Sequence, residues 1–239
     1  IKVHAWFNTY LIWSDSKPPK DSTHIYYTNP DFFETNYYGK SDINIDLNKI
    51  QSPSWEGLFL SPNNPDVNLY LLSLVKELFK EYPEIDGLHF DYIRFQDEIY
   101  GFNQKGVKIF EDKYQFNPKN IFRNIYNQKN GWSSSESDSI KNIWINFNCN
   151  NITNFIQSVK KHRDSLDLDI MISAAVKSNL INSRLVWFQN WSHWIENDII
   201  DFVIPMNYTT NNNIFLENLK IIKNNIPLDS YKKKVIIGI

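Results

Sequence analysis

The chain has 239 residues, of which 42% are hydrophobic and 22% are charged. This composition is ordinary for a folded globular protein, and the length suits one large domain or an α/β barrel. Its 25 Lys and Arg residues against 27 Asp and Glu residues leave a net charge of -2. Since no basic surplus exists to neutralise phosphates, nucleic acid is excluded as a partner. The one cysteine excludes an intrachain disulfide. We see no apolar run long enough for a membrane span.

Nearly continuous apolar runs predict strands that are buried on both faces, as in parallel sheets. In chain order these runs cover residues 1–8, 56–62, 85–91, 168–176, 200–208 and 234–239. Helical spacing lies between several of them, over residues 65–82, 152–159, 190–198 and 214–222. This alternation predicts parallel β/α units.

Two long connections, residues 9–55 and 92–150, follow predicted strands. The first offers no clear helix, whereas the second offers a short helix near 118–127 and an exposed polar loop over 131–139. Both leave the carboxyl ends of strands, where a β/α barrel builds its active site. No linker or repeat divides the chain, so we expect a single domain over residues 1–239.

An ionisable group ends one of the predicted strands. Strand alternation places Gly87, His89 and Asp91 on one side, with Asp91 at the rim. A carboxylate there is costly unless donors or a cation surround it, or unless its reactivity is its purpose. Tyr92 and Arg94 are close enough in sequence to contribute. The alternative is an Asp that ties down its own loop through hydrogen bonds.

Two other strand ends carry polar and aromatic side chains. Trp6 and Asn8 share one side of the first predicted strand, and Asn207 and Tyr208 end the fifth, on opposite sides. Aromatic rings that stack on sugar faces, with amides that bond hydroxyls, are typical of carbohydrate sites. A Trp buried in the core is the alternative reading of each position taken alone.

Three segments carry a resemblance to a known family: "KVHAWFNTYLIWS", "LFLSPNNPDVNLYLLSLVKELFKEYPEIDGLHFDYIRF" and "WIENDIIDFVIPMNY". Together they resemble glycosyl hydrolase-like family 10, a group of bacterial barrels. The resemblance implies a (β/α)8 TIM-type barrel, with the first and eighth strands outside this chain. It also implies hydrolysis of glycosidic bonds in a cell-envelope polysaccharide, such as peptidoglycan, or in an extracellular one. The protein would then act outside the cytoplasm: periplasmic, on the cell surface or secreted.

The chain departs from the family's pattern at two positions. Tyr92 stands where a second Asp often follows the first, and Met206 stands where Gln is common in the Pro-Gln-x-Tyr ending. The first departure puts a second carboxylate in doubt, and the other puts one substrate hydrogen bond in doubt.

Glycoside hydrolysis normally uses two carboxyl groups. Asp91 is the candidate nucleophile or base, and Asp97 and Glu98 are possible second carboxylates. Retention or inversion stays open without the carboxyl separation. We expect neither a metal nor a cofactor, since "DINIDLN" (42–48) lacks the Gly and Glu of a calcium loop and no His-Glu-x-x-His helix occurs.

The first hypothesis is therefore a glycosidase acting on a polysaccharide or oligosaccharide, and the second is a catalytically silent glycan-binding barrel. An intracellular metabolic barrel would need a phosphate-binding loop. The sequence does not specify an oligomeric state. The expected substrate-binding residues are Trp6, Asn8, His89, Tyr92, Arg94, Asn207 and Tyr208.

Overall fold

The computed structural model describes residues 1–50, 52, 55–121 and 134–238, and the chain divides into two compact units. The first unit contains Ile1–Thr9, Leu69–Arg94 and Cys149–Ile239. The second contains Tyr10–Asn68 and Phe95–Asn148. Beside this division, the single domain expected over residues 1–239 stays a prediction.

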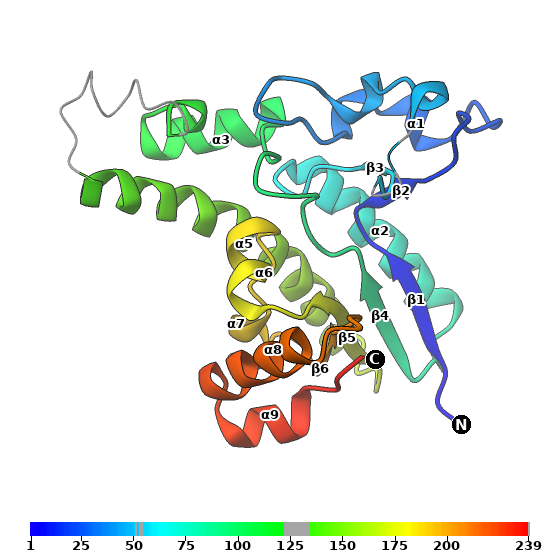
Figure 1. Cartoon of the computed structure of the whole chain (residues 1–239). Helices are drawn as coiled ribbons and strands as arrows, with labels where there is room; N and C mark the ends of the chain where they lie inside the picture. The colour runs from blue at the N-terminus through cyan, green and yellow to red at the C-terminus, as the bar shows by residue number, and fades with distance from the viewer. Residues whose placement is uncertain (51, 53–54, 122–133, 239) are drawn as a thin grey trace. The chain divides into compact units, whose positions relative to one another are not determined.

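A parallel sheet forms the centre of the first unit. Its strands are β1 (His4–Asn8), β4 (Gly87–Asp91), β5 (Met171–Lys177) and β6 (Phe202–Met206), in the spatial order β1-β4-β5-β6. All three pairings are parallel, and β1 and β4 run side by side in Figure 1. The predicted terminal strand joins β6 through two parallel bridges, at Val235 and Gly238. The parallel α/β character is confirmed, and closure into a (β/α)8 barrel stays a prediction.

The strand predicted over residues 56–62 does not belong to this sheet. Residues 58–59 form the short strand β3 (Leu58–Phe59), which pairs antiparallel with β2 (Leu11–Trp13) in the second unit. In the parallel sheet, β1 pairs directly with β4. Leu58 and Phe59 are fully buried. A continuous apolar run predicts that a strand is buried, but it does not predict which strand it pairs with. The expectation of a parallel strand was therefore wrong here.

The helices expected over residues 65–82, 190–198 and 214–222 are confirmed, and the one near 152–159 is the later part of a much longer helix. Residues 134–139, expected in a loop, form the first turns of that long helix, where Ser139 Oγ donates to Ser135 O at 2.8 Å. Residues 131–133 lie outside the described residues, as do 122–127 of the helix expected near 118–127. The helices are α1 (Ile25–Thr28), α2 (Pro65–Glu81), α3 (Gln104–Tyr114), α5 (Ser134–Ser165), α6 (Leu180–Val186), α7 (Trp191–Glu196), α8 (Asn212–Asn225) and α9 (Leu228–Lys234), with 3-10 turns at η1 (Pro30–Phe32), η2 (Asp42–Asn44), η3 (Leu47–Lys49) and η4 (Pro118–Asn120).

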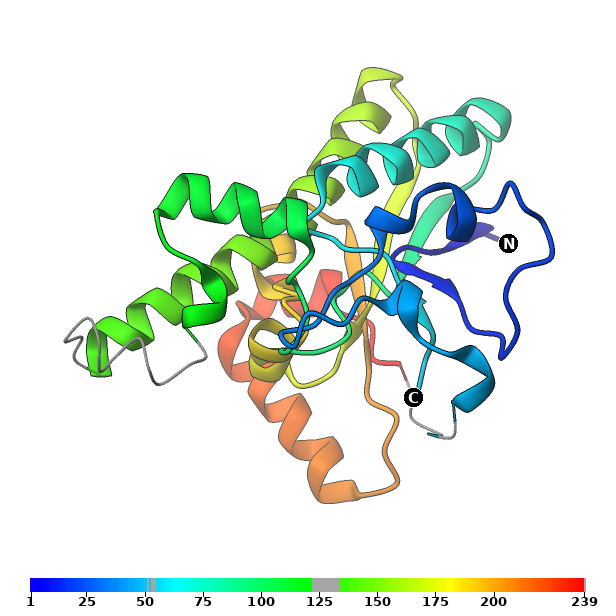
Figure 2. The same cartoon turned by 90° about the horizontal axis from the view of Figure 1, so that it is seen from above.

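The two faces of the parallel sheet differ in burial. On one face Leu88 and Phe90 are fully buried, and the Phe90 ring lies 5.7 Å from that of Phe155 on α5. On the other face Trp6 is 67% exposed, and Asp91 is half-buried. At the far end of the sheet, α9 lies against β6 and α8, as Figure 2 shows in red and orange. The apolar alternation of β4 therefore directs His89 and Asp91 to the less covered face.

The second unit has an aromatic core and two buried carboxyl groups. Phe102, Phe110 and Trp144 pack together, and the Trp144 ring centroid lies 5.2 Å from that of Phe102 and 4.9 Å from that of Phe110. Glu34 and Asp42 are both almost fully buried. Burial raises the pKa of Asp42 to about 7, although Phe59 N and Gln96 Nε2 donate to its carboxylate.

Replacement of Gly87 by Ala should destabilise the protein. A Cβ at Gly87 would lie 2.3–2.7 Å from three ring atoms of His4, its partner in the β1–β4 register. We expect a loss of about 1–3 kcal/mol in the free energy of unfolding. Denaturant unfolding measures it. The double variant His4→Ala/Gly87→Ala removes the clash, so it should be more stable than Gly87→Ala alone, and equal stabilities would contradict the account.

Because the pKa of Asp42 is raised, the protein should become less stable as the pH rises. Between the unfolded pKa of about 4 and the folded pKa of about 7 the folded state binds more protons, so raising the pH lowers the free energy of unfolding. The Asp42→Asn substitution removes the part of this pH dependence that comes from Asp42. Between about pH 4 and pH 8 its stability should gain about 2–4 kcal/mol relative to the unmodified chain. Parallel pH profiles in denaturant unfolding would contradict this expectation.

Candidate functional site

The pairing of β1 with β4 places four predicted site residues together. Trp6 is the register partner of His89, and Asn8 is the partner of Asp91. The Trp6 ring centroid lies 4.8 Å from that of His89, with the planes tilted by 58°. Thr9 N donates to Asp91 O at 2.8 Å, which extends the pairing one residue further. An exposed ring, an exposed amide and a carboxyl group thus share one end of one sheet face.

The backbone turns sharply immediately after Asp91. Tyr92 has a φ of 49°, in the left-handed region, and its N–H donates to Asp91 Oδ1 at 2.7 Å. Asp91 therefore does tie down its own turn, as the alternative reading had it, but through one oxygen while the side chain stays half-buried. A bulky residue in this conformation is strained, and such strain is typical of functional sites.

His89 lies beneath this rim and has a second partner that the sequence did not reveal. Its Nδ1 is 2.8 Å from Ser173 Oγ on β5, and Ser173 is its register partner. Burial lowers the pKa of His89, and the nearby His4 also lowers it, while the Asp91 carboxylate opposes both. The net effect favours the neutral imidazole of His89. The signal for Ser173 was available, since it is the one hydroxyl in the apolar β5 run.

The carboxyl end of β5 adds a cation that sequence reasoning also missed. Lys177 is the last residue of β5, and its Nζ lies 4.9 Å from the Trp187 ring centroid. Gln189 Oε1 accepts from Lys177 N at 2.8 Å, and Gln189 Nε2 donates to Ile93 O and Ala175 O, both at 3.3 Å. The buried Gln189 thus joins the end of β5 to the segment after Asp91. A polar pair, Gln189 and Asn190, inside the aromatic run "VWFQNW" was its only sequence signal.

The other expected binding residues differ in how they are presented. Arg94 is almost fully buried, and its Cζ lies 5.3 Å from the Tyr92 ring centroid. Asn207 is also buried; its Nδ2 donates to Phe215 O at 3.1 Å, and its Oδ1 accepts from Asn218. Tyr208 is 69% exposed. These bonds of Asn207 hold the start of α8, so its contact with substrate stays a prediction, as does that of Arg94.

The two possible second carboxylates belong to the second unit. Asp97 is half-buried, and its Oδ1 accepts from Ile99 N at 2.9 Å. Glu98 is exposed. Among the described strands of the parallel sheet, only β4 ends on a carboxylate, since β1, β5 and β6 end on Asn8, Lys177 and Met206.

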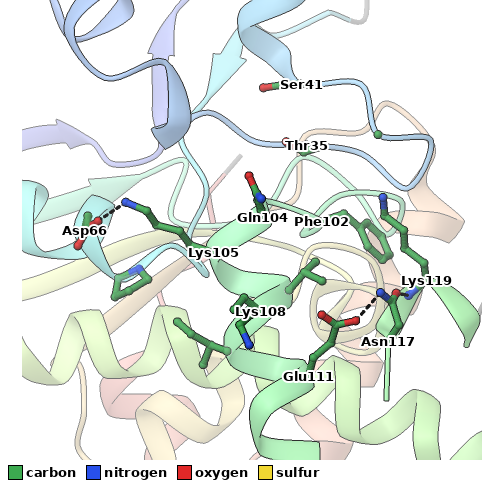
Figure 3. A pocket seen from close by; sticks show the side chains of 14 residues that line it. Thr35, Ser41, Asp66, Phe102, Gln104, Lys105, Lys108, Glu111, Asn117 and Lys119 are labelled. Carbon is green, nitrogen blue, oxygen red and sulfur yellow. Dashed lines mark hydrogen bonds and ion pairs between the residues drawn. The ribbon is translucent and has the colours of Figure 1, made fainter. Parts of the chain in front are cut away.

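A cavity of about 1000 Å³ lies within the second unit, against α3 (Figure 3). Several of its polar side chains are held in ion pairs or hydrogen bonds. Lys105 Nζ lies 2.5 Å from Asp66 and 3.1 Å from Asp31, and Glu111 accepts from Asn117 at 2.5 Å. The residues expected to bind or cleave a glycan do not line it. We therefore place the candidate site at the strand ends of the first unit.

The described residues contain neither a metal-binding cluster nor a membrane-spanning helix. No group of three or more His, Cys, Asp or Glu side chains there could hold a metal ion. No helix there is long and apolar enough to cross a membrane.

Comparison with known proteins supports the resemblance seen in the sequence. A search of curated proteins gives no match. A family model described as "Glycosyl hydrolase-like 10" matches residues 1–236, which is nearly the whole chain. The parallel sheet, the strand-end carboxyl group and the exposed tryptophan agree with this match. The chain belongs to glycosyl hydrolase-like family 10.

Proposed function

We propose that the protein hydrolyses glycosidic bonds in a cell-envelope polysaccharide, such as peptidoglycan, or in an extracellular one. Family membership indicates a carbohydrate-related function. The observation that carries the finer proposal is the position of Asp91. Its carboxyl group ends β4 on the less covered sheet face, beside the exposed Trp6 and Asn8.

Asp91 is assigned as nucleophile or base. Both roles need a carboxylate held toward the ligand, and the hydrogen bond from Tyr92 N to Oδ1 fixes the orientation of the Asp91 side chain. Its half-buried side chain still leaves it open to a ligand. Trp6 supplies a ring on which a sugar can stack, and Asn8 supplies an amide for sugar hydroxyls.

A hydrolase of this kind also needs a group that protonates the leaving oxygen. Of the two candidates in this chain we prefer Glu98. Asp97 Oδ1 accepts the N–H of Ile99, so the Asp97 carboxyl group holds the backbone of its own turn. Glu98 is exposed and keeps its carboxyl group on the surface of the loop.

A second function, glycan binding without hydrolysis, is favoured by one observation. Tyr92 occupies the position where the family's pattern often has a second Asp, and its ring lies against Arg94. In that case the site keeps its stacking ring and amide and lacks an acid–base pair. Both functions place the protein where polysaccharides are, outside the cytoplasm, and cell fractionation tests that location.

Asp91→Asn should abolish turnover and spare binding. Loss of a catalytic carboxylate is expected to lower kcat by about 10²–10⁴-fold. The measurement is release of reducing ends from purified cell-wall glycan strands and from a panel of soluble polysaccharides. Glu84→Gln, which removes the same charge from an exposed residue before β4, is the matched control and should keep full activity. Equal turnover by Asp91→Asn and the unmodified protein would refute the catalytic role.

Trp6→Ala should weaken glycan binding with little effect on folding, because its ring is 67% exposed. Loss of one stacking ring is expected to cost about tenfold in affinity. Titration calorimetry with the same glycans measures it. Trp6→Phe should recover much of the affinity. Tyr82→Ala removes another exposed ring, just beyond α2, and should change nothing. A similar loss in both alanine variants would argue against a stacking platform.

A further inference from the structure

Three oxygen atoms lie in a row in the interior of the second unit. Ser61 Oγ is 2.5 Å from Glu34 Oε1 and 2.8 Å from Asn63 Oδ1. Each of the three residues is at most 1% exposed. Two oxygen atoms approach this closely only when a hydrogen lies between them, so the row needs two hydrogens.

The hydrogens can be counted from the donors present. The Ser61 hydroxyl supplies one, and an amide oxygen supplies none. The orientation of the Asn63 amide follows from its other end, because its Nδ2 is 2.6 Å from Gly101 O, a carbonyl that can only accept. Asn63 Oδ1 therefore faces Ser61 and takes the hydroxyl hydrogen. The hydrogen in the shorter contact must then come from Glu34.

We propose that Glu34 is a neutral, protonated acid that donates to Ser61 and positions the loop of residues 96–101. Its other oxygen, Oε2, accepts from Gly101 N at 3.0 Å. That loop carries Asp97 and Glu98, so the catalytic part of this inference rests on the proposed function. Glu34 acts on the loop through the backbone that holds its carboxylates.

The loop is fastened at both ends to the segment that contains Glu34. Gln96 Nε2 donates to Asp42 Oδ2 at 2.7 Å, and Tyr37 N donates to Ile99 O at 2.6 Å. Gly101, with a φ of +100°, ends the loop in a backbone conformation that L side chains rarely adopt. The Glu34 carboxyl group is thus one of several anchors along this segment.

The electrostatics agree with the hydrogen count. Burial raises the pKa of Glu34 well above its ordinary value, and the negative charge of Asp42 raises it further, while the hydrogen bonds that Glu34 shares with Ser61, Gly101 and Thr35 oppose this rise. Asp42 in turn is bonded by Tyr100 and Gln96 and feels the charge of Asp97. A second ionised carboxylate in this interior would be costly, so a neutral Glu34 lowers the repulsion.

The protonation state can be measured without any activity assay. A difference infrared spectrum, unmodified chain minus Glu34→Gln, isolates the Glu34 carboxyl signal. At about pH 7, far above the ordinary glutamate pKa of about 4.3, it should show the band of a protonated carboxyl group. A carboxylate band alone at that pH would overturn the proposal.

The positioning role is tested with two variants of similar size. Glu34→Gln keeps a donor for Ser61 and an acceptor for Gly101 N, so hydrogen exchange at the Gly101 amide and kcat should both stay within about twofold of the unmodified chain. Glu34→Leu removes both bonds, so exchange at that amide should rise, and kcat should fall, by at least about tenfold.

These outcomes separate the inference from the proposed function. If Asp91→Asn leaves turnover intact, the proposed function fails, while the infrared band and amide exchange still decide the state of Glu34. If Glu34→Leu loosens the loop and turnover is unaffected, the positioning role is wrong. If Glu34→Gln is impaired as strongly as Glu34→Leu, the neutral acid is wrong. If the Glu34→Leu variant does not fold, the infrared spectrum and the Glu34→Gln variant still decide whether Glu34 is a neutral acid.

Discussion

The in-register parallel pairing of β1 with β4 is the constraint on which the candidate site depends. It joins residues more than eighty positions apart, so that Trp6 meets His89 and Asn8 meets Asp91. A slip of one residue would turn every side chain of β1 to the other face. Gly87 makes the pairing possible at its lower end, because its missing side chain leaves room for the His4 ring.

The carboxyl group of Asp91 and those of Glu34 and Asp42 have contrasting environments. Asp91 stays half-buried at the end of β4, where a strained turn at Tyr92 gives it one backbone donor. Glu34 and Asp42 are almost fully buried and bonded to loops of the second unit. Of these two environments, the first suits chemistry on a ligand. The buried pair instead joins polar segments that have little regular secondary structure, a role in which a neutral acid serves better than an ion.

Much of the secondary structure was predictable because the local signals were strong. Pro65 begins α2 and Pro83 follows its end, while Val67, Leu71 and Val75 recur on its buried side. The helix α3 was missed, and α5 was seen only in part. Their amino-terminal portions are polar and carry a single apolar face, so the pattern is weak until tertiary packing supplies the partners. The strand at residues 58–59 shows the opposite failure, a strong apolar signal whose pairing partner is set by the fold.

The sequence by itself determined the parallel α/β class, the family, and the position of an acidic residue at the end of a buried strand. These depend on local periodicity and on short motifs, which are properties of neighbouring residues. Only the tertiary structure decided that Ser173 bonds His89, that Gln189 joins two strand ends, and that Glu34 lies in a row of three oxygens. The physical reason is that hydrogen bonds between distant segments require precise distances, and hydrophobic periodicity carries no information about which buried polar groups will meet.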